Sequence, residues 1–252
     1  AVFGLLGSIE YFRLTRDPLD PAFAWFGKLL SAAYWLAALA WMVREGTAQP
    51  AWMDLLLLTL GVQGSFLLCY RRGLEGEATL RRIFTLLFGL VYTVVFFGFL
   101  LRLMYFSTDG ENKPLGLPLV LFVVMVTKFS DMGAYAFGVL FGRHKMIPHI
   151  SPAKSWEGLG GAFVGAFLAA SVLMAALPEE LAPLNWTHAM LLAPLLCITG
   201  VTGDLAESVI KRCIAIKDTG HAFPGIGGIL DLTDSLLFPA PVFYFSLTAI
   251  SA

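Results

Sequence analysis

The sequence is poor in charged residues. Asp, Glu, Lys and Arg make up 14% of its 252 residues, hydrophobic residues make up 58%, and the formal net charge is −1. Soluble domains carry about 25% charged residues, so this chain has too few charges to cover a surface that faces water. We therefore expect its apolar surface to lie in a lipid bilayer. A net charge near zero offers no attraction to nucleic acids, and we expect no nucleic-acid partner.

Cysteine and several common motifs are also scarce. Cys69, Cys197 and Cys213 lie far apart, in or beside apolar runs, so they provide neither a disulfide framework nor the spacing of a metal site. The sequence contains no G-x-x-x-x-G-K-[ST] phosphate-binding loop and no H-E-x-x-H zinc motif. Any nucleotide or metal chemistry therefore needs another arrangement of residues.

Long apolar runs dominate the sequence instead. About 20 apolar residues make one transmembrane helix, and the runs predict an all-α, polytopic integral membrane protein with about eight transmembrane helices in a single domain, 1–252. We expect the first helix to be truncated, because the chain begins with Ala1 inside an apolar run. The predicted spans are 1–13, 26–43, 52–70, 83–105, 117–141, 157–177, 188–210 and 234–251.

The basic residues predict which side of the membrane each connection faces. Every second connection between the predicted spans is basic, and these connections hold 13 of the 17 Lys and Arg residues. The positive-inside rule places them in the cytoplasm. The 13 residues are Arg13, Arg16, Lys28, Arg71, Arg72, Arg81, Arg82, Arg143, Lys145, Lys154, Lys211, Arg212 and Lys217.

Two charged residues lie inside the fifth predicted span. Lys128 and Asp131 are three residues apart, so they share a helix face and could form an ion pair. A charge at the centre of a membrane helix costs about 2.5–3.5 kcal/mol. The pair is either a structural contact between helices or part of a substrate or ion path.

Acidic and basic residues also gather at the end of the seventh predicted span. Asp204, Ser208 and Lys211 follow one another at i, i+4 and i+7 and therefore share one face of a helix, which Glu207 borders. Lys211 and Arg212 could simply reach the lipid head groups. That interpretation does not explain Asp204, which lies more than one turn deeper.

The last predicted span begins with two aspartates. Asp231 and Asp234 are three residues apart and follow a glycine-rich turn that begins after Lys217 and Asp218. Capping of the helix N-terminus explains one aspartate, whereas two on one face suit a divalent cation such as Mg²⁺. Both interpretations stay open at this point.

A further basic residue precedes the sixth predicted span. Ser151 or Ser155 is a candidate N-cap for that helix, and Lys154 beside the helix N-terminus makes a candidate anion site. Apart from the Lys128 and Asp131 pair, all these groups lie near the cytoplasmic ends of spans. Carboxylates that bind metal and cations that neutralise phosphate occur together in enzymes of phosphoryl or nucleotidyl transfer.

Residues 208–234, SVIKRCIAIKDTGHAFPGIGGILDLTD, closely resemble the signature of the phosphatidate cytidylyltransferase (CDP-diacylglycerol synthase) family. The segments DMGAYAFG (131–138), ISPAKSWEG (150–158) and GDLAES (203–208) also resemble segments of that family. Two positions depart from its pattern, because Ile226 stands where the family usually has His and Leu232 stands where it usually has Arg. Taken together, these segments extend the resemblance over at least residues 131–235, in the same order along the chain.

The resemblance implies that CTP and phosphatidate give CDP-diacylglycerol and pyrophosphate with Mg²⁺, and it leaves a second cation open. It implies a cytoplasmic catalytic loop near 211–233, in a protein of the bacterial inner membrane. The implied metal ligands are Asp204, Asp231 and Asp234. The implied catalytic residues are Asp204, Lys211, Arg212, Lys217, Asp218 and Asp231. The implied substrate-binding residues are Asp131, Lys154, Ser155, Ser208, Gly227 and Gly228.

Three alternatives remain. The protein could use another lipid, as a cytidylyltransferase of an ether lipid phosphate or as a CTP-dependent kinase of a polyprenol. It could be a transporter that uses Lys128 and Asp131, although a transporter does not need a basic, glycine-rich loop with Asp-x-x-Asp. It could also be a non-catalytic relative, given Ile226 and Leu232. A homodimer is a further option, because the small residues of 158–165 favour close helix packing.

Overall fold

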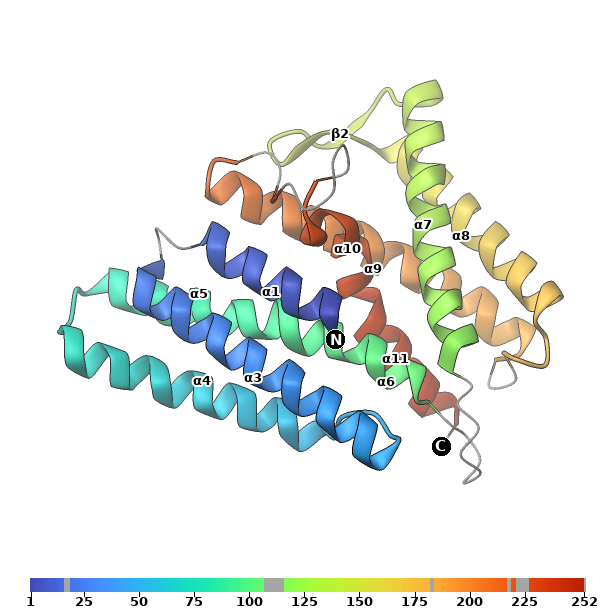
Figure 1. The fold of residues 1–252 in the computed structure, drawn as a ribbon. Helices are drawn as coiled ribbons and strands as arrows, with labels where there is room; N and C mark the ends of the chain where they lie inside the picture. Colours follow the sequence, from blue (N-terminus) through green and yellow to red (C-terminus); the bar gives the residue numbers. More distant parts are fainter. Residues whose placement is uncertain (16–18, 107–115, 182–183, 217–218, 221–226, 252) are drawn as a thin grey trace. The chain divides into compact units, whose positions relative to one another are not determined.

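The computed structural model describes residues 1–15, 19–106, 116–181, 184–216, 219–220 and 227–251 (Figure 1). The chain divides into two compact units. The first unit comprises Ala1–Leu101 and Ile216–Leu232, and the second comprises Arg102–Ala215 and Thr233–Ala252. The described residues are helical apart from turns, loops and one short hairpin, so the prediction of an all-α, polytopic membrane protein is confirmed. That the two units act as one domain stays a prediction.

Among the described residues, six helical segments are long and apolar enough to cross a membrane. They are Pro21–Glu45, Ala51–Arg71, Glu77–Met104, Gly116–Phe141, Trp156–Ala176 and Trp186–Cys213. They coincide with the second to seventh spans expected from the sequence. The expected first and last spans correspond to helices of 13, 9 and 12 residues, each shorter than the about 20 residues that cross a bilayer.

The first unit is a bundle of antiparallel helices. It contains α1 (Val2–Leu14), α3 (Pro21–Glu45), α4 (Ala51–Arg72) and α5 (Glu77–Leu90). Helix α5 continues through the π-helical turn η1 (Val91–Val95) into α6 (Phe96–Met104), which belongs to this unit up to Leu101. The start of α3 is fixed by Asp20, whose Oδ1 accepts a hydrogen bond from the amide of Ala22 at 2.8 Å. Pro21 suits the first helical position, where no backbone donor is required.

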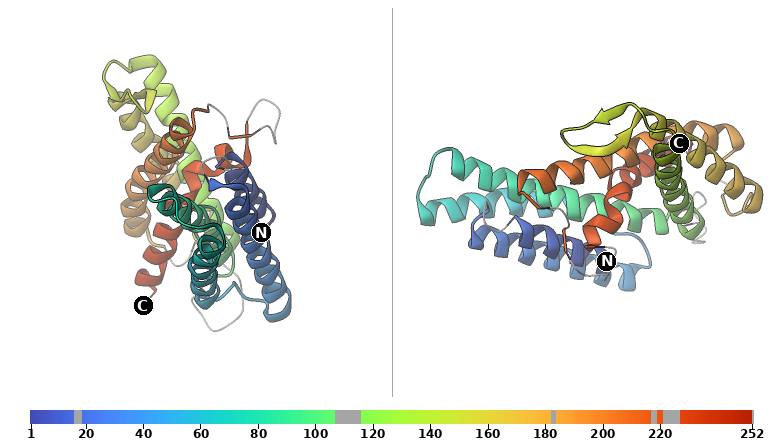
Figure 2. Two further views of the ribbon diagram at one scale, coloured as in Figure 1. Left: turned by 90° about the vertical axis from the view of Figure 1, so that its left-hand side faces the viewer. Right: turned by 90° about the horizontal axis from the view of Figure 1, so that it is seen from above.

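Aromatic rings fill the first unit where glycines leave room. Phe12 of α1 is fully buried, and its ring occupies the space where a side chain on Gly27 of α3 would lie. The Trp35 ring lies against Gly4 in the same way. The helices α1 and α3 therefore pack closely side by side (Figure 2).

The second unit contains most of the residues predicted to be functional. It consists of α7 (Gly116–Phe141), a hairpin of β1 (Lys145–Ile147) and β2 (Ser151–Ser155), α8 (Trp156–Ala176), α9 (Trp186–Cys213) and α11 (Pro239–Ile250). The hairpin is antiparallel and pairs Lys145 with Ser155. It lies between the fifth and sixth predicted spans, and the sequence did not predict it because strands this short give no clear periodicity.

The expected last span, 234–251, is divided into two helices. The first is α10 (Ile229–Leu237), which begins in the first unit and ends in the second, and the second helix is α11. Pro239 begins α11 and has no amide hydrogen to continue the bonding of α10. Within the second unit, Phe243 of α11 is fully buried and stacks on Phe122 of α7, with ring centroids 5.4 Å apart.

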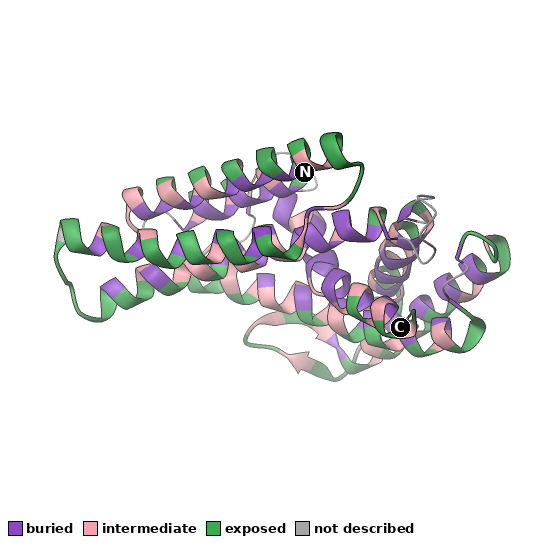
Figure 3. Cartoon of the chain, turned by 90° about the horizontal axis from the view of Figure 1, so that it is seen from below, coloured by how far each residue is buried: buried purple, intermediate pink, exposed green. Residues whose placement is uncertain are grey.

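Glycines bring α7 and α8 into backbone contact. A Cβ atom on Gly161 would overlap the carbonyl oxygen of Gly133, and one on Gly165 would overlap that of Phe129. The expected close packing of the glycines in 158–165 is thus confirmed within the unit, as in other membrane helix pairs with small residues. The exposed residues, green in Figure 3, include large apolar side chains such as Leu140 and Val164, as expected of a lipid-facing surface.

We expect Gly165→Ala to destabilise the protein, because the added methyl group meets the backbone of Phe129. Overpacking of this kind costs about 1–3 kcal/mol. The matched control is Gly160→Ala, since a Cβ on exposed Gly160 meets no atom within 4 Å. The thermal midpoint in detergent should fall for Gly165→Ala and stay unchanged or rise slightly for Gly160→Ala. Equal thermal midpoints for the two variants would show that the close approach of α7 and α8 at Gly165 does not contribute to stability.

Candidate functional site

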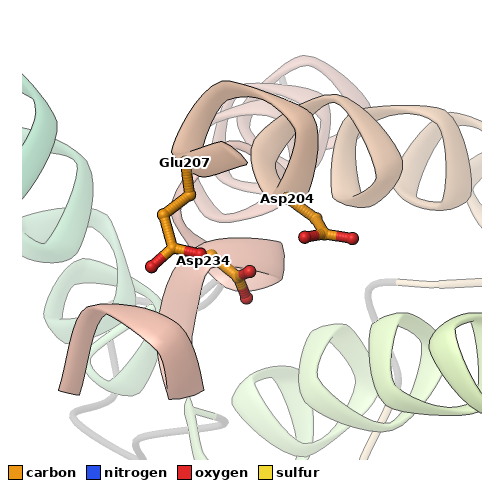
Figure 4. Close-up of side chains that lie close together, drawn as sticks. All are labelled: Asp204, Glu207 and Asp234. Carbon is orange, nitrogen blue, oxygen red and sulfur yellow. The ribbon is translucent and has the colours of Figure 1, made fainter. Parts of the chain in front are cut away.

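Three acidic side chains lie together in the second unit (Figure 4). Asp204 and Glu207 project from α9 and Asp234 from α10, and one carboxylate oxygen of each lies within 4.8 Å of the others. Glu207 is 2% exposed and Asp234 is 9% exposed. Three carboxylates this close repel one another strongly out of water, so the cluster needs protons or cations to balance it.

Glycine allows α9 and α10 to approach closely enough to form this acidic cluster. A Cβ atom on Gly203 would lie 2.5 Å from the backbone oxygen of Asp234, and one on Gly200 would lie 3.5 Å from that of Ser235. Any larger residue at position 203 would therefore separate the two helices. The glycine before Asp204 in the GDLAES segment has this packing role.

Two lysines bind carboxylates of the acidic cluster. Lys211 Nζ lies 2.9 Å from Glu207 Oε2, and Lys154 Nζ lies 2.6 Å from Asp204 Oδ2. Lys154 also donates a hydrogen bond to the carbonyl of Val201 at 3.3 Å. Lys154 was predicted as part of an anion site and Lys211 as a catalytic residue. Both lysines thus lie beside the predicted metal ligands Asp204 and Asp234. Lys154 comes from the hairpin and Lys211 from α9.

The acidic cluster has the oxygen donors that a hard divalent cation prefers. One of them is unsatisfied, because Glu207 Oε1 is buried and no N–H or O–H group among the described residues donates a hydrogen bond to it. A cation between the three carboxylates would both supply that partner and offset the repulsion. The residues present therefore fit Mg²⁺.

Glu207 is a candidate metal ligand that the sequence did not predict. It borders the face of Asp204, but we did not include it among the metal ligands. Its spacing of three residues from Asp204 would have indicated it, since residues at i and i+3 are neighbours on a helix. The structure adds that Glu207 is buried, which the sequence does not reveal.

A cavity of about 500 Å³ lies beside Asp204. Its walls come from α7, the hairpin, α8 and α9, and four of the residues predicted to be functional line it: Asp131, Lys154, Ser155 and Asp204. Lys145, which we did not predict, lines it as well. The cavity thus combines charged groups with an apolar wall that includes Val139 and Leu159.

The pairing of Lys128 with Asp131 is confirmed. Lys128 Nζ lies 3.7 Å from Asp131 Oδ2 and donates a hydrogen bond to Ser235 Oγ at 2.9 Å. The predicted N-cap is also confirmed, because buried Ser155 Oγ accepts a hydrogen bond from the amide of Gly158 at 3.1 Å. Neither contact tests whether Asp131 or Ser155 binds a substrate.

Asp231 organises the described part of the glycine-rich loop in the first unit. Its Oδ2 accepts hydrogen bonds from the amide and hydroxyl of Thr219, at 3.0 and 2.8 Å, and from the amide of Gly228 at 2.7 Å. Gly227 has φ +107°, a conformation that favours glycine. Asp231 belongs to the first unit and Asp204 to the second, so their shared metal site stays a prediction.

The remaining predicted residues show fewer contacts. Ser208 is half-buried on α9. Arg212 is exposed, and its Nε donates a hydrogen bond to the carbonyl of Ile150 at 3.4 Å. Lys217, Asp218 and Ile226 lie outside the described residues.

The fold and the acidic cluster define a polytopic helical membrane protein with a candidate cation site next to lysines. The sequence matches the Cytidylyltransferase family over residues 1–250, and the chain belongs to that family.

Its relatives include proteins from several bacteria. The chain is 36% identical over 194 residues to the uncharacterized protein YnbB of Escherichia coli (strain K12), covering 76% of this chain and 63% of YnbB. It is 39% identical over 147 residues to the phosphatidate cytidylyltransferase of Bacillus subtilis (strain 168), covering 58% of this chain and 54% of that protein. With that of Mycobacterium leprae (strain TN) it shares 39% identity over 146 residues, which cover 58% of this chain and 44% of the relative.

We expect the acidic cluster to bind Mn²⁺ as a probe for Mg²⁺. Asp204→Asn and Asp234→Asn should each weaken Mn²⁺ binding by about tenfold or more, since each removes a charged ligand. Glu180→Gln is the matched control, because Glu180 is exposed and lies outside the cluster. Electron paramagnetic resonance titration of the purified protein measures free Mn²⁺. Unchanged binding in both aspartate variants would exclude the cluster as the cation site.

Proposed function

We propose that the protein transfers the cytidylyl group of CTP to phosphatidate, which gives CDP-diacylglycerol and pyrophosphate. The observation that carries the proposal is the cluster of Asp204, Glu207 and Asp234, paired with Lys154 and Lys211, in a chain of the Cytidylyltransferase family. Two relatives, of whose length this chain covers about half, bear the name phosphatidate cytidylyltransferase. The substrates of the whole protein are part of this proposal.

The proposed reaction is an in-line displacement at phosphorus. A phosphate oxygen of the lipid attacks the α-phosphorus of CTP, the bond from that phosphorus to the bridging oxygen breaks, and pyrophosphate leaves. Because the attacking oxygen is already an anion, no general base is needed. Most of the catalytic power then comes from positioning and from neutralising the charge on the reacting phosphate.

The chain supplies these two functions through charged side chains. Asp204, Glu207 and Asp234 would hold Mg²⁺, with Asp231 as the further ligand expected from the sequence. Bound Mg²⁺ supplies neutralisation of phosphate charge. A cation bound by the carboxylates would weaken their ion pairs with Lys154 and Lys211, so that both ammonium groups would be available to phosphate oxygens. A second cation remains an open part of the proposal.

The other predicted residues have supporting roles in this proposal. Asp131 and Ser155 line the cavity next to Lys154 and orient the substrate. Arg212 and Lys217 bind the phosphates of the nucleotide or of the lipid, and Asp218 is a further catalytic residue expected from the sequence. Ser208, Gly227 and Gly228 complete the substrate-binding site. The lipid enters sideways from the cytoplasmic leaflet of a bacterial inner membrane. A homodimer is compatible with this arrangement and is not required by it.

A different lipid phosphate is the second candidate acceptor. Ile226 and Leu232 replace a histidine and an arginine that are usual in the family signature, which removes two candidate phosphate contacts. The acidic residues remain. Ether-linked phosphatidate and polyprenyl phosphate should therefore be tested beside diacyl phosphatidate, and the preferred acceptor is the one with the higher kcat/KM.

We expect purified protein to form a radiolabelled CDP-lipid from labelled CTP and phosphatidate only when Mg²⁺ is present. Asp231→Asn should lower kcat by about 100-fold or more, because it removes a proposed ligand and weakens the bonds to Thr219 and Gly228. Glu180→Gln should have wild-type turnover. Absence of CDP-lipid from the wild type with all three acceptors would refute the proposed function. Wild-type turnover in Asp231→Asn would refute only the role of Asp231.

A further inference from the structure

Glu157 fastens the base of the hairpin that carries Lys154. Its Oε2 accepts hydrogen bonds from the backbone amides of Arg143 and His144, both at 3.2 Å. Its Oε1 lies 2.6 Å from Nδ1 of the His144 ring. One carboxylate of α8 therefore binds both residues that lead from α7 into β1. The Glu157 side chain is 26% exposed.

Glu157 does more than cap its own helix. An acidic residue in the first turn of a helix usually interacts with the free amides of that turn. In α8 the N-cap is Ser155, which already binds the amide of Gly158. The Glu157 carboxylate interacts with its own amide and also reaches the segment before β1, so helix capping alone does not explain its contacts.

The hairpin has two further attachments. At its base, the amide of Trp156 donates a hydrogen bond to the carbonyl of His144 at 3.0 Å. At its turn, Arg212 Nε donates to the carbonyl of Ile150. Lys154 lies between these attachments and reaches Asp204 and Val201 of α9. The hairpin is thus fixed on both sides of this lysine.

We propose that Glu157 is a positioning residue, which sets the place of Lys154 beside Asp204 by fixing the base of the hairpin. The inference rests on the proposed function in one respect, namely that Lys154 contacts a substrate phosphate. A short hairpin has little stability of its own, so its orientation depends on such attachments. A displacement of 1 Å at a catalytic group can lower the rate by about 100-fold.

The first test measures the position of Lys154 without any reaction. The purified full chain is treated briefly with an amine-acylating reagent, and the labelling rate of each lysine is read by mass spectrometry. In Glu157→Gln and Glu157→Ala we expect Lys154 to be labelled several-fold faster than in the wild type, because its contacts with Asp204 and Val201 loosen. Glu157→Asp should restore part of the protection, and His144→Ala should have an intermediate effect because it removes only the ring contact.

The controls separate positioning from loss of folding. Glu180→Gln should leave the labelling of Lys154 unchanged, and Lys28 of the first unit should be labelled at the same rate in every variant. A faster rate at both lysines would mean general unfolding, and the proposal would then be judged on His144→Ala and Glu157→Asp. Wild-type labelling of Lys154 in His144→Ala or in a folded Glu157→Ala protein would overturn the proposal, and so would labelling in Glu157→Asp as fast as in Glu157→Gln.

The second test uses turnover. Glu157→Gln should lower kcat/KM by about tenfold to 100-fold, and it should cause no additional loss in a Lys154→Ala background, since a positioning residue acts through its partner. Additive losses would overturn the role of Glu157. If the wild type forms no CDP-lipid, the proposed function fails while the labelling experiment still decides whether Glu157 positions Lys154.

Discussion

The repulsion between the carboxylates of Asp204, Glu207 and Asp234 is the constraint on which the second unit depends. Buried charges of one sign are tolerated only when cations or protons balance them. Lys154 and Lys211 supply two positive charges against three carboxylates. Within the part of the chain that the structure describes, these two ion pairs alone leave the cluster with an excess of negative charge when all three carboxylates are ionised. Such a site attracts a divalent cation and, with it, an anionic substrate.

Small residues make this arrangement possible. Gly203 lets α9 reach the backbone of α10, and without that approach Asp234 would not lie near Asp204 and Glu207. Gly161 and Gly165 bring α7 and α8 together in the same way, and this helix pair supports one side of the cavity. Helices in a bilayer gain no hydrophobic driving force from one another, so close backbone contact is what stabilises such pairs.

The hairpin adds a basic group that does not come from a membrane helix. Lys154 approaches Asp204 from β2, whereas Lys211 approaches Glu207 from the same helix, at i+4. An i, i+4 pair is fixed by helix geometry. The place of Lys154 instead depends on a short strand pair and on contacts such as those of Glu157, so this side of the site is the more sensitive to changes in the surrounding residues.

Hydrophobicity and helical spacing by themselves determined the helical membrane class, six of the spans and the shared face of Asp204, Ser208 and Lys211, because these features repeat locally along the chain. The pairing of Lys128 with Asp131 and the Ser155 cap could be predicted for the same reason. Only the tertiary structure decided that Glu207 is buried with Asp204 and Asp234 and that Lys154 binds Asp204. Such contacts join residues far apart in sequence, and their formation depends on glycine-mediated helix packing and a hairpin too short to leave a periodic pattern.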